Sequence, residues 1–149
     1  MVLRFYFYSV NDYLTQKIEK MEPTTLSLTE TNADIVRRGY AAFNTADMNA
    51  LNEIFHDESS WHTPGKSIVG GNHKGKGAVF TQFGKYGGET NGTFKATLKT
   101  LAICDDGRVV GLHNNSGERN GRKLNTECCI VFEIKDGQIY SGKEFFFNL

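Results

Sequence analysis

Residues 35–55 read IVRRGYAAFNTADMNALNEIF, and this stretch holds two helical patterns separated by a short polar break. Val36, Tyr40 and Phe43 recur at the spacing that puts side chains on one face of a helix. A polar segment ends that period, and Asp47 then offers a side chain suited to capping a second helix. The stretch therefore predicts two consecutive helices joined by a tight connection.

The C-terminal half of the chain follows a different pattern. From residue 93 onward apolar and polar residues alternate, which is typical of half-buried strands. Turn signals separate the alternating segments, the strongest being Asn120-Gly121. We expect four antiparallel strands in a meander, preceded by a short strand at residues 59–63. Helices that precede an antiparallel sheet in this way indicate an α+β domain.

Residues 65–92 join the two halves and contain nine of the sixteen glycines. Apolar residues within this segment predict one short helix, which we expect to end at Gly84 and the Gly87-Gly88 pair. The remainder of the segment is expected to form a loop.

The length and net charge of the chain indicate a single-domain protein and exclude some classes of function. The chain has 149 residues, enough for one domain, with 17 Lys and Arg against 17 Asp and Glu. A neutral chain lacks the basic surface of a nucleic-acid binder, and no apolar run reaches the length of a membrane helix. Three cysteines, two of them adjacent, favour free thiols and a cytoplasmic protein. We expect residues 29–149 to form the domain and residues 1–28 to be an extension outside it; the alternative is an extra strand or helix that docks.

Three stretches together carry a resemblance to a known family. They are residues 35–55, the segment WHTPGKS at residues 61–67, and the aromatic end EFF at residues 144–146. In this order they resemble the nuclear-transport-factor-2-like superfamily, and within it the SnoaL-like, ketosteroid-isomerase-related branch. The resemblance implies a cone in which a curved antiparallel sheet wraps about three helices and encloses a pocket. Many members of this superfamily are homodimers, so the resemblance also implies a homodimer here.

The ketosteroid isomerase reaction itself is disfavoured. That enzyme needs a general base together with a tyrosine and a protonated carboxylic acid that stabilise an oxyanion. Aligned with its pattern, this chain has Gly39 at the tyrosine position, Thr63 at the base position and Ile130 at the acid position. None of these side chains can perform the corresponding step.

Three other side chains are candidates for proton transfer. His62 is the expected general base, because imidazole titrates near neutral pH and the family places this strand at the mouth of the pocket. Tyr40 or Glu144 is its expected partner. The structural alternatives are a histidine that only hydrogen-bonds a loop and a glutamate that faces outward toward a lysine.

Aromatic residues are the candidates for substrate binding. They belong first to a hydrophobic core, but a cone of this size leaves part of its wide end open as a cavity. With one histidine added, the candidate ligand-binding residues are Trp61, Phe80, Phe83, Tyr86, His113 and Phe146. The histidines lack the spacing of a metal site, so we expect neither a metal nor a cofactor.

Two classes of function are consistent with these residues. The first is cofactor-independent proton transfer, of the isomerase, cyclase or hydrolase type, on a small apolar substrate. The second is a non-catalytic module that binds a ligand or forms a dimer. Strand residues 124–134 carry Glu127, Cys129, Val131 and Glu133 on one side, and we expect this outer sheet face to form a homodimer.

Overall fold

The structure is a computed structural model that describes residues 31–147. The chain divides into two units, Met1–Thr31 and Asn32–Leu149, and all of the strands belong to the second unit. The expectation for residues 1–28 lies outside the described residues. Within residues 31–147, no helix is both long and apolar enough to cross a membrane.

Three helical segments precede the meander. The first described helix covers residues 31–45, and the connection after it leads into α2 (Met48–Ile54). Asp47 caps α2 as predicted, since its carboxylate accepts a hydrogen bond from the backbone N–H of Ala50 at 3.0 Å. The third helix, α3 (Lys76–Glu89), lies between two short strands and the meander.

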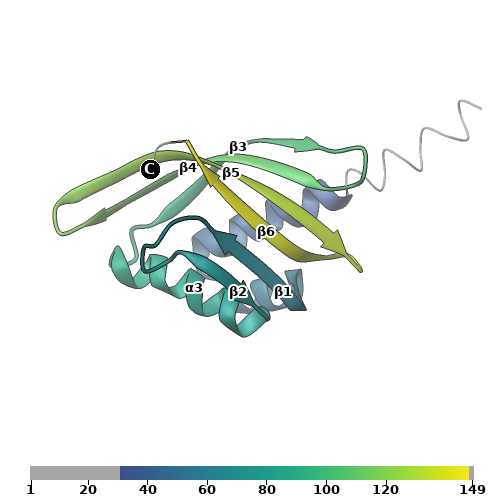
Figure 1. Ribbon diagram of the computed structural model, residues 1–149, viewed down its shortest axis with the longest axis horizontal. Coiled ribbons are helices and arrows are strands. Elements are labelled where there is room, and N and C mark those ends of the chain that lie inside the picture. Colours follow the sequence, from purple (N-terminus) through teal and green to yellow (C-terminus); the bar gives the residue numbers. More distant parts are fainter. Residues whose placement is uncertain (1–30, 148–149) are drawn as a thin grey trace, which may run out of the picture. The chain divides into compact units, whose positions relative to one another are not determined.

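Six strands form one curved sheet (Figure 1). The strands are β1 (Phe55–Thr63), β2 (Gly71–Lys74), β3 (Lys95–Ile103), β4 (Val109–Arg119), β5 (Arg122–Lys135) and β6 (Gln138–Phe146). Their order is β2-β1-β6-β5-β4-β3, with β1 parallel to β6 and every other pair antiparallel. The predicted α+β class and the four-stranded meander are confirmed.

The glycine-rich segment is more regular than predicted. α3 continues through Gly84 and the Gly87-Gly88 pair, and β2 occupies part of the expected loop. Glycine lowers helix propensity by about 1 kcal/mol relative to alanine, but packing can override this cost. Val79 and Gln82 of α3 are fully buried, and that packing keeps the helix intact across its glycines.

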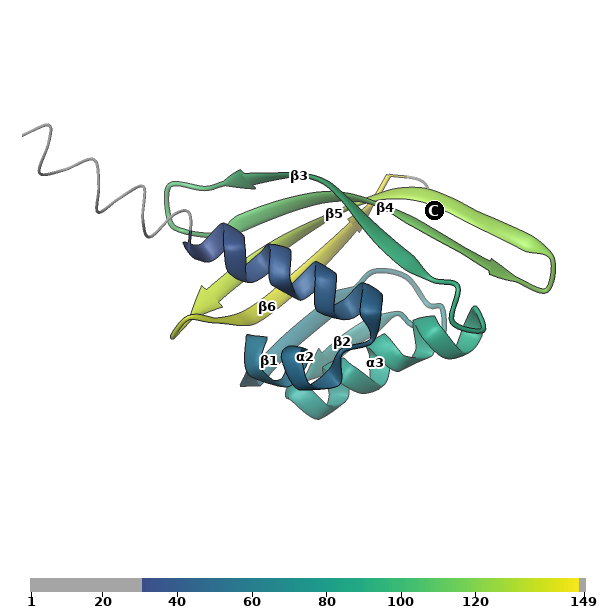
Figure 2. The same cartoon turned by 180° about the vertical axis from the view of Figure 1, so that it is seen from behind.

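The helices lie against the concave inner face of the sheet, as Figure 2 shows for the helix of residues 31–45. Two glycines of the sheet allow large side chains to approach its inner face closely. A Cβ atom at Gly111 would lie 2.7 Å from the Tyr40 hydroxyl oxygen, and one at Gly142 would lie 2.1 Å from the Trp61 ring. Any larger residue would displace these rings.

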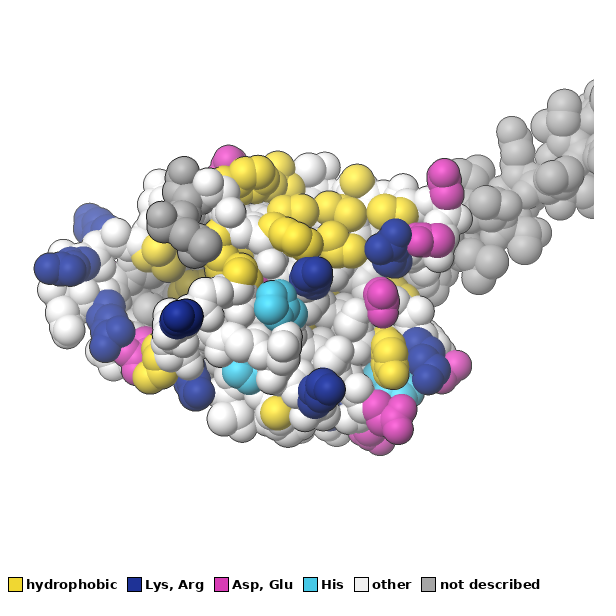
Figure 3. Space-filling view, viewed as in Figure 1, with side chains coloured by type: hydrophobic (Ala, Val, Ile, Leu, Met, Phe, Trp, Pro, Cys, Tyr) yellow, Lys and Arg dark blue, Asp and Glu magenta, His cyan; other side chains and the backbone are white. Residues whose placement is uncertain are grey.

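The opposite, outer face of the sheet is solvent-exposed in the single chain. Hydrophobic side chains gather on it between basic and acidic ones (Figure 3). The outward-facing apolar residues at matching registers of β3 to β6 are Ala102, Val110, Leu112, Cys129, Val131 and Phe145. We call this set the outer apolar patch.

Candidate active site

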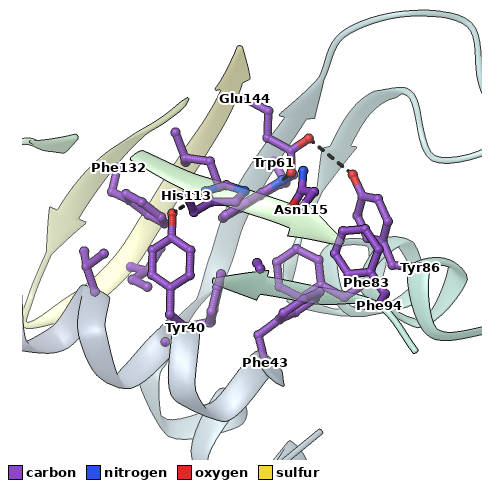
Figure 4. A pocket seen from close by; sticks show the side chains of 16 residues that line it. Tyr40, Phe43, Trp61, Phe83, Tyr86, Phe94, His113, Asn115, Phe132 and Glu144 are labelled. Carbon is purple, nitrogen blue, oxygen red and sulfur yellow. Dashed lines mark hydrogen bonds between the residues drawn. The ribbon is translucent and has the colours of Figure 1, made fainter. Parts of the chain in front are cut away.

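A cavity of about 50 Å³ lies between the inner face of the sheet, the helix of residues 31–45 and α3. Figure 4 shows the side chains of the 16 residues that line it, most of which are aromatic or aliphatic. This volume has room for a few water molecules, whereas typical ligand pockets measure about 300–1,000 Å³. The cavity is therefore narrow in this conformation.

A carboxyl group lies at one end of the cavity. Glu144 of β6 is only 6% exposed. Its Oε1 accepts a hydrogen bond from Trp61 Nε1 at 2.9 Å, and its Oε2 accepts one from the Tyr86 hydroxyl at 3.3 Å (Figure 4). Because Trp61 comes from β1 and Tyr86 from α3, three elements fix the position of this carboxyl group.

The surroundings of Glu144 favour its protonated form. Burial raises the pKa of the Glu144 carboxyl above its ordinary value, and hydrogen bonds from Trp61, Thr63 and Tyr86 oppose that rise. A carboxyl group with a raised pKa is both a stronger base when ionised and a usable acid when protonated. This is the property that proton transfer near neutral pH requires.

A buried amide lies behind this end of the cavity. Gln82 of α3 donates from Nε2 to the Thr63 hydroxyl at 3.0 Å and to the Val69 carbonyl at 3.3 Å. Its Oε1 is buried and has no hydrogen-bond partner among the described residues. Gln82 therefore holds Thr63 in place next to Glu144.

A second polar group comes from β4 and the helix of residues 31–45. The Tyr40 hydroxyl and His113 Nδ1 lie 2.8 Å apart in a buried hydrogen bond. Burial lowers the pKa of His113 to about 4, against a smaller opposing effect of its hydrogen bond with Asn115. The ring is therefore neutral at physiological pH, with one nitrogen that donates and one that accepts.

The two polar groups interact electrostatically through the cavity. Burial is the main cause that raises the pKa of Tyr40 above its ordinary value, and Coulombic interactions with Cys128 and Glu144 raise it further. Tyr40 thus stays protonated and acts as a neutral hydrogen-bond donor. A base candidate and a donor candidate face the same small space.

Aromatic rings close the remaining walls. Phe43 and Phe83 meet edge to face with centroids 5.3 Å apart, and Trp61 meets Phe83 at 5.0 Å. Tyr86 and Phe94 stack with centroids 4.5 Å apart. These walls exclude water and strengthen the electrostatic interactions of the polar groups inside.

Most of the predicted site residues line this cavity. The structure brings together two of the three catalytic candidates, Tyr40 and Glu144. It also brings in four of the six binding candidates, which are Trp61, Phe83, Tyr86 and His113. The outward orientation considered for Glu144 is wrong, because its carboxyl group is buried.

His62 is not among the residues that line the cavity. Side chains alternate along β1, and Trp61 and Thr63 are buried on the inner face. His62 lies on the opposite face, where its Nδ1 is 2.5 Å from Oδ1 of Asn72. The structure thus corrects its expected position at the pocket.

Phe80 and Phe146 also lie outside the cavity lining. Phe80 packs edge to face on Phe55, with centroids 5.6 Å apart, and lines a separate depression beside α2. Phe146 packs against the core next to Cys128, its register partner on β5. Both rings are core residues in this conformation.

Asn115 is a cavity residue that was not predicted from the sequence. It follows His113 by two positions on β4, so strand alternation alone indicates that the two side chains share a face. Gln82 was not predicted either, and for it the sequence carries no signal beyond its place among the apolar residues of α3. Glu127 is exposed and forms an ion pair with Lys99, in agreement with its expected surface position.

The described residues contain no group of three or more His, Cys, Asp or Glu side chains that could hold a metal ion. The polar side chains of the cavity instead comprise one carboxyl, two phenols, one imidazole and one amide. Such a set can donate, accept and transfer protons.

Known proteins resemble this chain over most of its length. Bal32a, from a soil-derived mobile gene cassette, is 55% identical, with a TM-score of 0.79 over 81% of this chain and 92% of its own. A protein of unknown function with a cystatin-like fold from Xanthomonas campestris is 28% identical, with a TM-score of 0.73 over 78% and 91%. The uncharacterized protein Rv0034 of Mycobacterium tuberculosis is 27% identical over 78% of this chain and 89% of its own.

A family model matches most of the chain. The model of the SnoaL-like domain matches residues 36–142, which include most of the first described helix, α2, α3, β1 to β5 and the first half of β6. Solved structures with the nuclear-transport-factor-2-like fold agree with this match. The chain therefore belongs to the SnoaL-like domain family and has the nuclear-transport-factor-2-like fold.

Proposed function

We propose that this protein catalyses cofactor-independent proton transfer on a small, largely apolar carbonyl compound. The observation that carries the proposal is the buried Glu144 carboxyl, which accepts hydrogen bonds from Trp61 and Tyr86 inside an aromatic cavity. Tyr40 supplies a neutral donor in the same cavity. A base with a raised pKa beside a donor is the arrangement that abstraction of a proton next to a carbonyl requires.

Each residue has a defined role in this proposal. The ionised Glu144 carboxylate removes a proton from the carbon beside the carbonyl, and the electrons move onto the carbonyl oxygen. In this step His113 has the tautomer that donates from Nδ1–H to the Tyr40 oxygen, so the Tyr40 hydroxyl keeps its own proton to donate a hydrogen bond to that developing oxyanion. Return of the proton from Glu144 to a second carbon of a conjugated enolate completes an isomerisation. In a cyclisation the enolate carbon attacks another carbonyl of the same molecule, and the alkoxide that forms takes the proton back from Glu144.

This arrangement differs from that of a ketosteroid isomerase. Gly39, Thr63 and Ile130 occupy the positions of its functional side chains and cannot perform its steps. The proposed base here comes from β6 instead, where Glu144 is the register partner of Ile130. The likeness to that enzyme supports the cavity and not its reaction.

Exchange of a carbon-bound proton tests the proposal directly. We choose 2-tetralone, a small bicyclic ketone, and measure deuterium uptake from heavy water by proton NMR. The wild-type protein is expected to accelerate exchange, and Glu144→Gln to reduce that acceleration by about 10²–10⁴-fold. Tyr40→Phe, which keeps the ring and removes the hydroxyl, is expected to reduce it by a smaller factor.

His62→Gln is the matched control, because it changes a titratable residue of the same sheet on the opposite face. We expect it to change exchange far less than Glu144→Gln does, because His62 acts on the pKa of Glu144 only through the smallest of its causes, a Coulombic one. If wild type and Glu144→Gln give the same exchange rate as buffer, the reaction is excluded for this class of ketone. Binding of 2-tetralone without exchange would instead favour the non-catalytic ligand-binding module.

We further propose a homodimer formed through the outer apolar patch. Phe145 is 46% exposed in the single chain; its register partner on the neighbouring strand is Cys129, and Val131 follows two positions further on the same face. A two-fold interface would bury both copies of the patch. Light scattering should give twice the chain mass of 16.7 kDa for wild type and the single mass for Val131→Glu; a wild-type monomer would overturn the proposal.

Two simpler proposals concern the chain as a whole. The cysteines at 104, 128 and 129 are free thiols, which supports a cytoplasmic protein. The family match begins at residue 36, which supports a domain formed by residues 29–149 with residues 1–28 outside it. Deletion of residues 1–21 should then leave the melting temperature unchanged, and a loss above about 1 kcal/mol would contradict this boundary.

A further inference from the structure

An open groove of about 850 Å³ adjoins the cavity, and Tyr86 and Phe94 line both. Their stacked rings, with centroids 4.5 Å apart, form the wall between the two spaces. The cavity alone has room for only a few water molecules. A molecule that is larger than the cavity and whose reacting atoms reach Glu144 can extend past these rings into the groove.

The inner face of the β4–β5 hairpin extends from the cavity into the groove. On β4, Asn115 lines the cavity and Gly117, two residues further on, lines the groove. Leu124, the register partner of Gly117, continues this face on β5 and is 41% exposed. At a rise of about 3.3 Å per residue, Arg119 lies roughly 13 Å beyond Asn115 along β4.

Two arginines face each other at the tip of this hairpin. Arg119 and Arg122 are register partners across the Asn120-Gly121 turn, so their side chains lie on one face, and both line the groove. Like charges at directly opposed strand positions repel each other. Their arrangement favours an anion between them.

The carboxylates nearby neutralise only part of this charge. Arg119 pairs with Glu89 at 2.7 Å, whereas Arg122 forms no ion pair within the described part of the chain. Glu118, the other acidic residue of the groove, is the register partner of Lys123 on the opposite face of the hairpin. Only Nη2 of Arg119 takes part in its ion pair, so Arg119, Arg122 and Glu89 together keep a net positive charge at the outer end of the groove.

We propose that the ligand is an elongated carboxylate whose apolar end occupies the cavity and whose charged end binds Arg119 and Arg122. The planar guanidinium group suits a carboxylate, and a bridging anion relieves the repulsion between the two arginines. The apolar surface of Ile68, Val69 and Leu124 contacts the middle of the molecule. This inference names a substrate class for the proposed function and rests on it for the reacting end alone.

A series of ω-phenylalkanoic acids of increasing chain length, with their primary amides, tests this inference. Binding to the ¹⁵N-labelled full chain is followed by NMR. The acid is expected to bind more tightly than the amide only in the longer members, by about 5-fold, as exposed charge pairs allow. The backbone signals of Asn115 and Gly117 should shift together, because the probe spans the cavity and the groove.

Two variants show which arginine causes the preference for the acid over the amide. Arg122→Gln should bring the preference for the acid close to one. Arg108→Gln is the matched control, since Arg108 lies at the β3–β4 hairpin and pairs with Asp106 instead. It should leave the preference unchanged.

Three results would overturn the inference: equal affinity of acid and amide at every length, a preference that survives Arg122→Gln, or no binding by any member. Its failure is separable from that of the proposed reaction. If the acids bind more tightly than the amides but 2-tetralone undergoes no exchange, the proposed reaction is wrong and the carboxylate site stands. If exchange depends on Glu144 but acids and amides bind equally, the reaction stands and the carboxylate site is wrong.

Discussion

The two faces of the sheet differ in chemistry although the same strands supply both. On β1, Trp61 points into the cavity and its neighbour His62 points away from it. On β6, Glu144 points into the cavity and its neighbour Lys143 points out, where its Nζ lies 5.5 Å from the centre of the Phe145 ring. A shift of one residue in either strand would exchange the two faces.

The comparison shows that strand parity, and not residue type, decides which titratable groups reach the cavity. His62 carries an imidazole, a common group for proton transfer, but faces outward. Glu144 becomes suitable only because it is buried beside Trp61 and Tyr86. Substitutions on the two faces test this difference, and the largest effect is expected at a glycine of β6.

Close packing on the inner face makes Gly142 the most sensitive glycine. Gly142→Ala places a Cβ atom 2.1 Å from the Trp61 ring, so the ring must move and its hydrogen bond to Glu144 is lost. We expect a loss of about 3 kcal/mol or more in the free energy of unfolding, measured by urea denaturation.

Gly84→Ala is the control, because a Cβ atom there has no neighbour within 4 Å. In the interior of α3 this change should stabilise the protein by about 0.5–1 kcal/mol. Equal effects of the two substitutions would contradict the close approach of Trp61 to β6.

Lowering the pH should reduce the free energy of unfolding, because His113 is buried in its neutral form. The pKa of His113 is about 4 in the folded chain against an ordinary 6.5, so the unfolded chain takes up a proton that the folded chain refuses. The resulting stability is present above pH 6.5 and is lost as the pH falls toward 4, by about 3 kcal/mol in total.

Urea denaturation of wild type and His113→Asn at pH 7 and pH 4 isolates this contribution. The raised pKa of Glu144 acts in the opposite direction, because protonation favours the folded chain, but both proteins share it. Wild type should therefore lose more stability than His113→Asn over this interval. A parallel loss in both proteins would show that His113 is not buried in its neutral form.

The smallest expected difference in stability is between substitutions at the neighbouring residues Trp61 and His62. Trp61→Phe keeps most of the ring but removes the N–H that donates to Glu144 Oε1, so we expect a loss of about 1–3 kcal/mol. His62→Ala alters the outer face and should change stability by at most about 0.5 kcal/mol. Thermal unfolding of both variants measures the difference, and a larger loss for His62→Ala would reverse the assignment of the two faces.

Local patterns in the sequence predicted much of the fold. The Asn120-Gly121 turn and the alternation on either side of it determine the β4–β5 hairpin, in which both turn residues have positive φ. The cap at Asp47 is equally local. α3 was underestimated, because its continuation through the glycines depends on burial against the sheet and not on helix propensity.

The site was harder to predict because its contacts join distant parts of the chain. The hydrogen bond from Trp61 to Glu144 spans 83 positions and depends on the parallel pairing of β1 with β6, for which the sequence offers no turn signal. The outward position of His62 was easier to predict from the sequence. Its neighbour Trp61 is apolar and belongs on the inner face, so strand alternation places His62 on the outer face. Residue type suggested Glu144, and only the structure decides its orientation.

The titration of the Glu144 carboxyl carbon is the most direct test of its proposed role as the base. Carbon NMR on protein labelled at its glutamate carboxyl groups, with Glu144→Gln to assign the signal, measures the pKa of this group alone. Burial beside Trp61 and Tyr86 predicts a pKa above the ordinary 4.5. A titration at or below 4.5 would show a solvated or fully compensated carboxylate, and Glu144 could then not be the base of the proposed reaction.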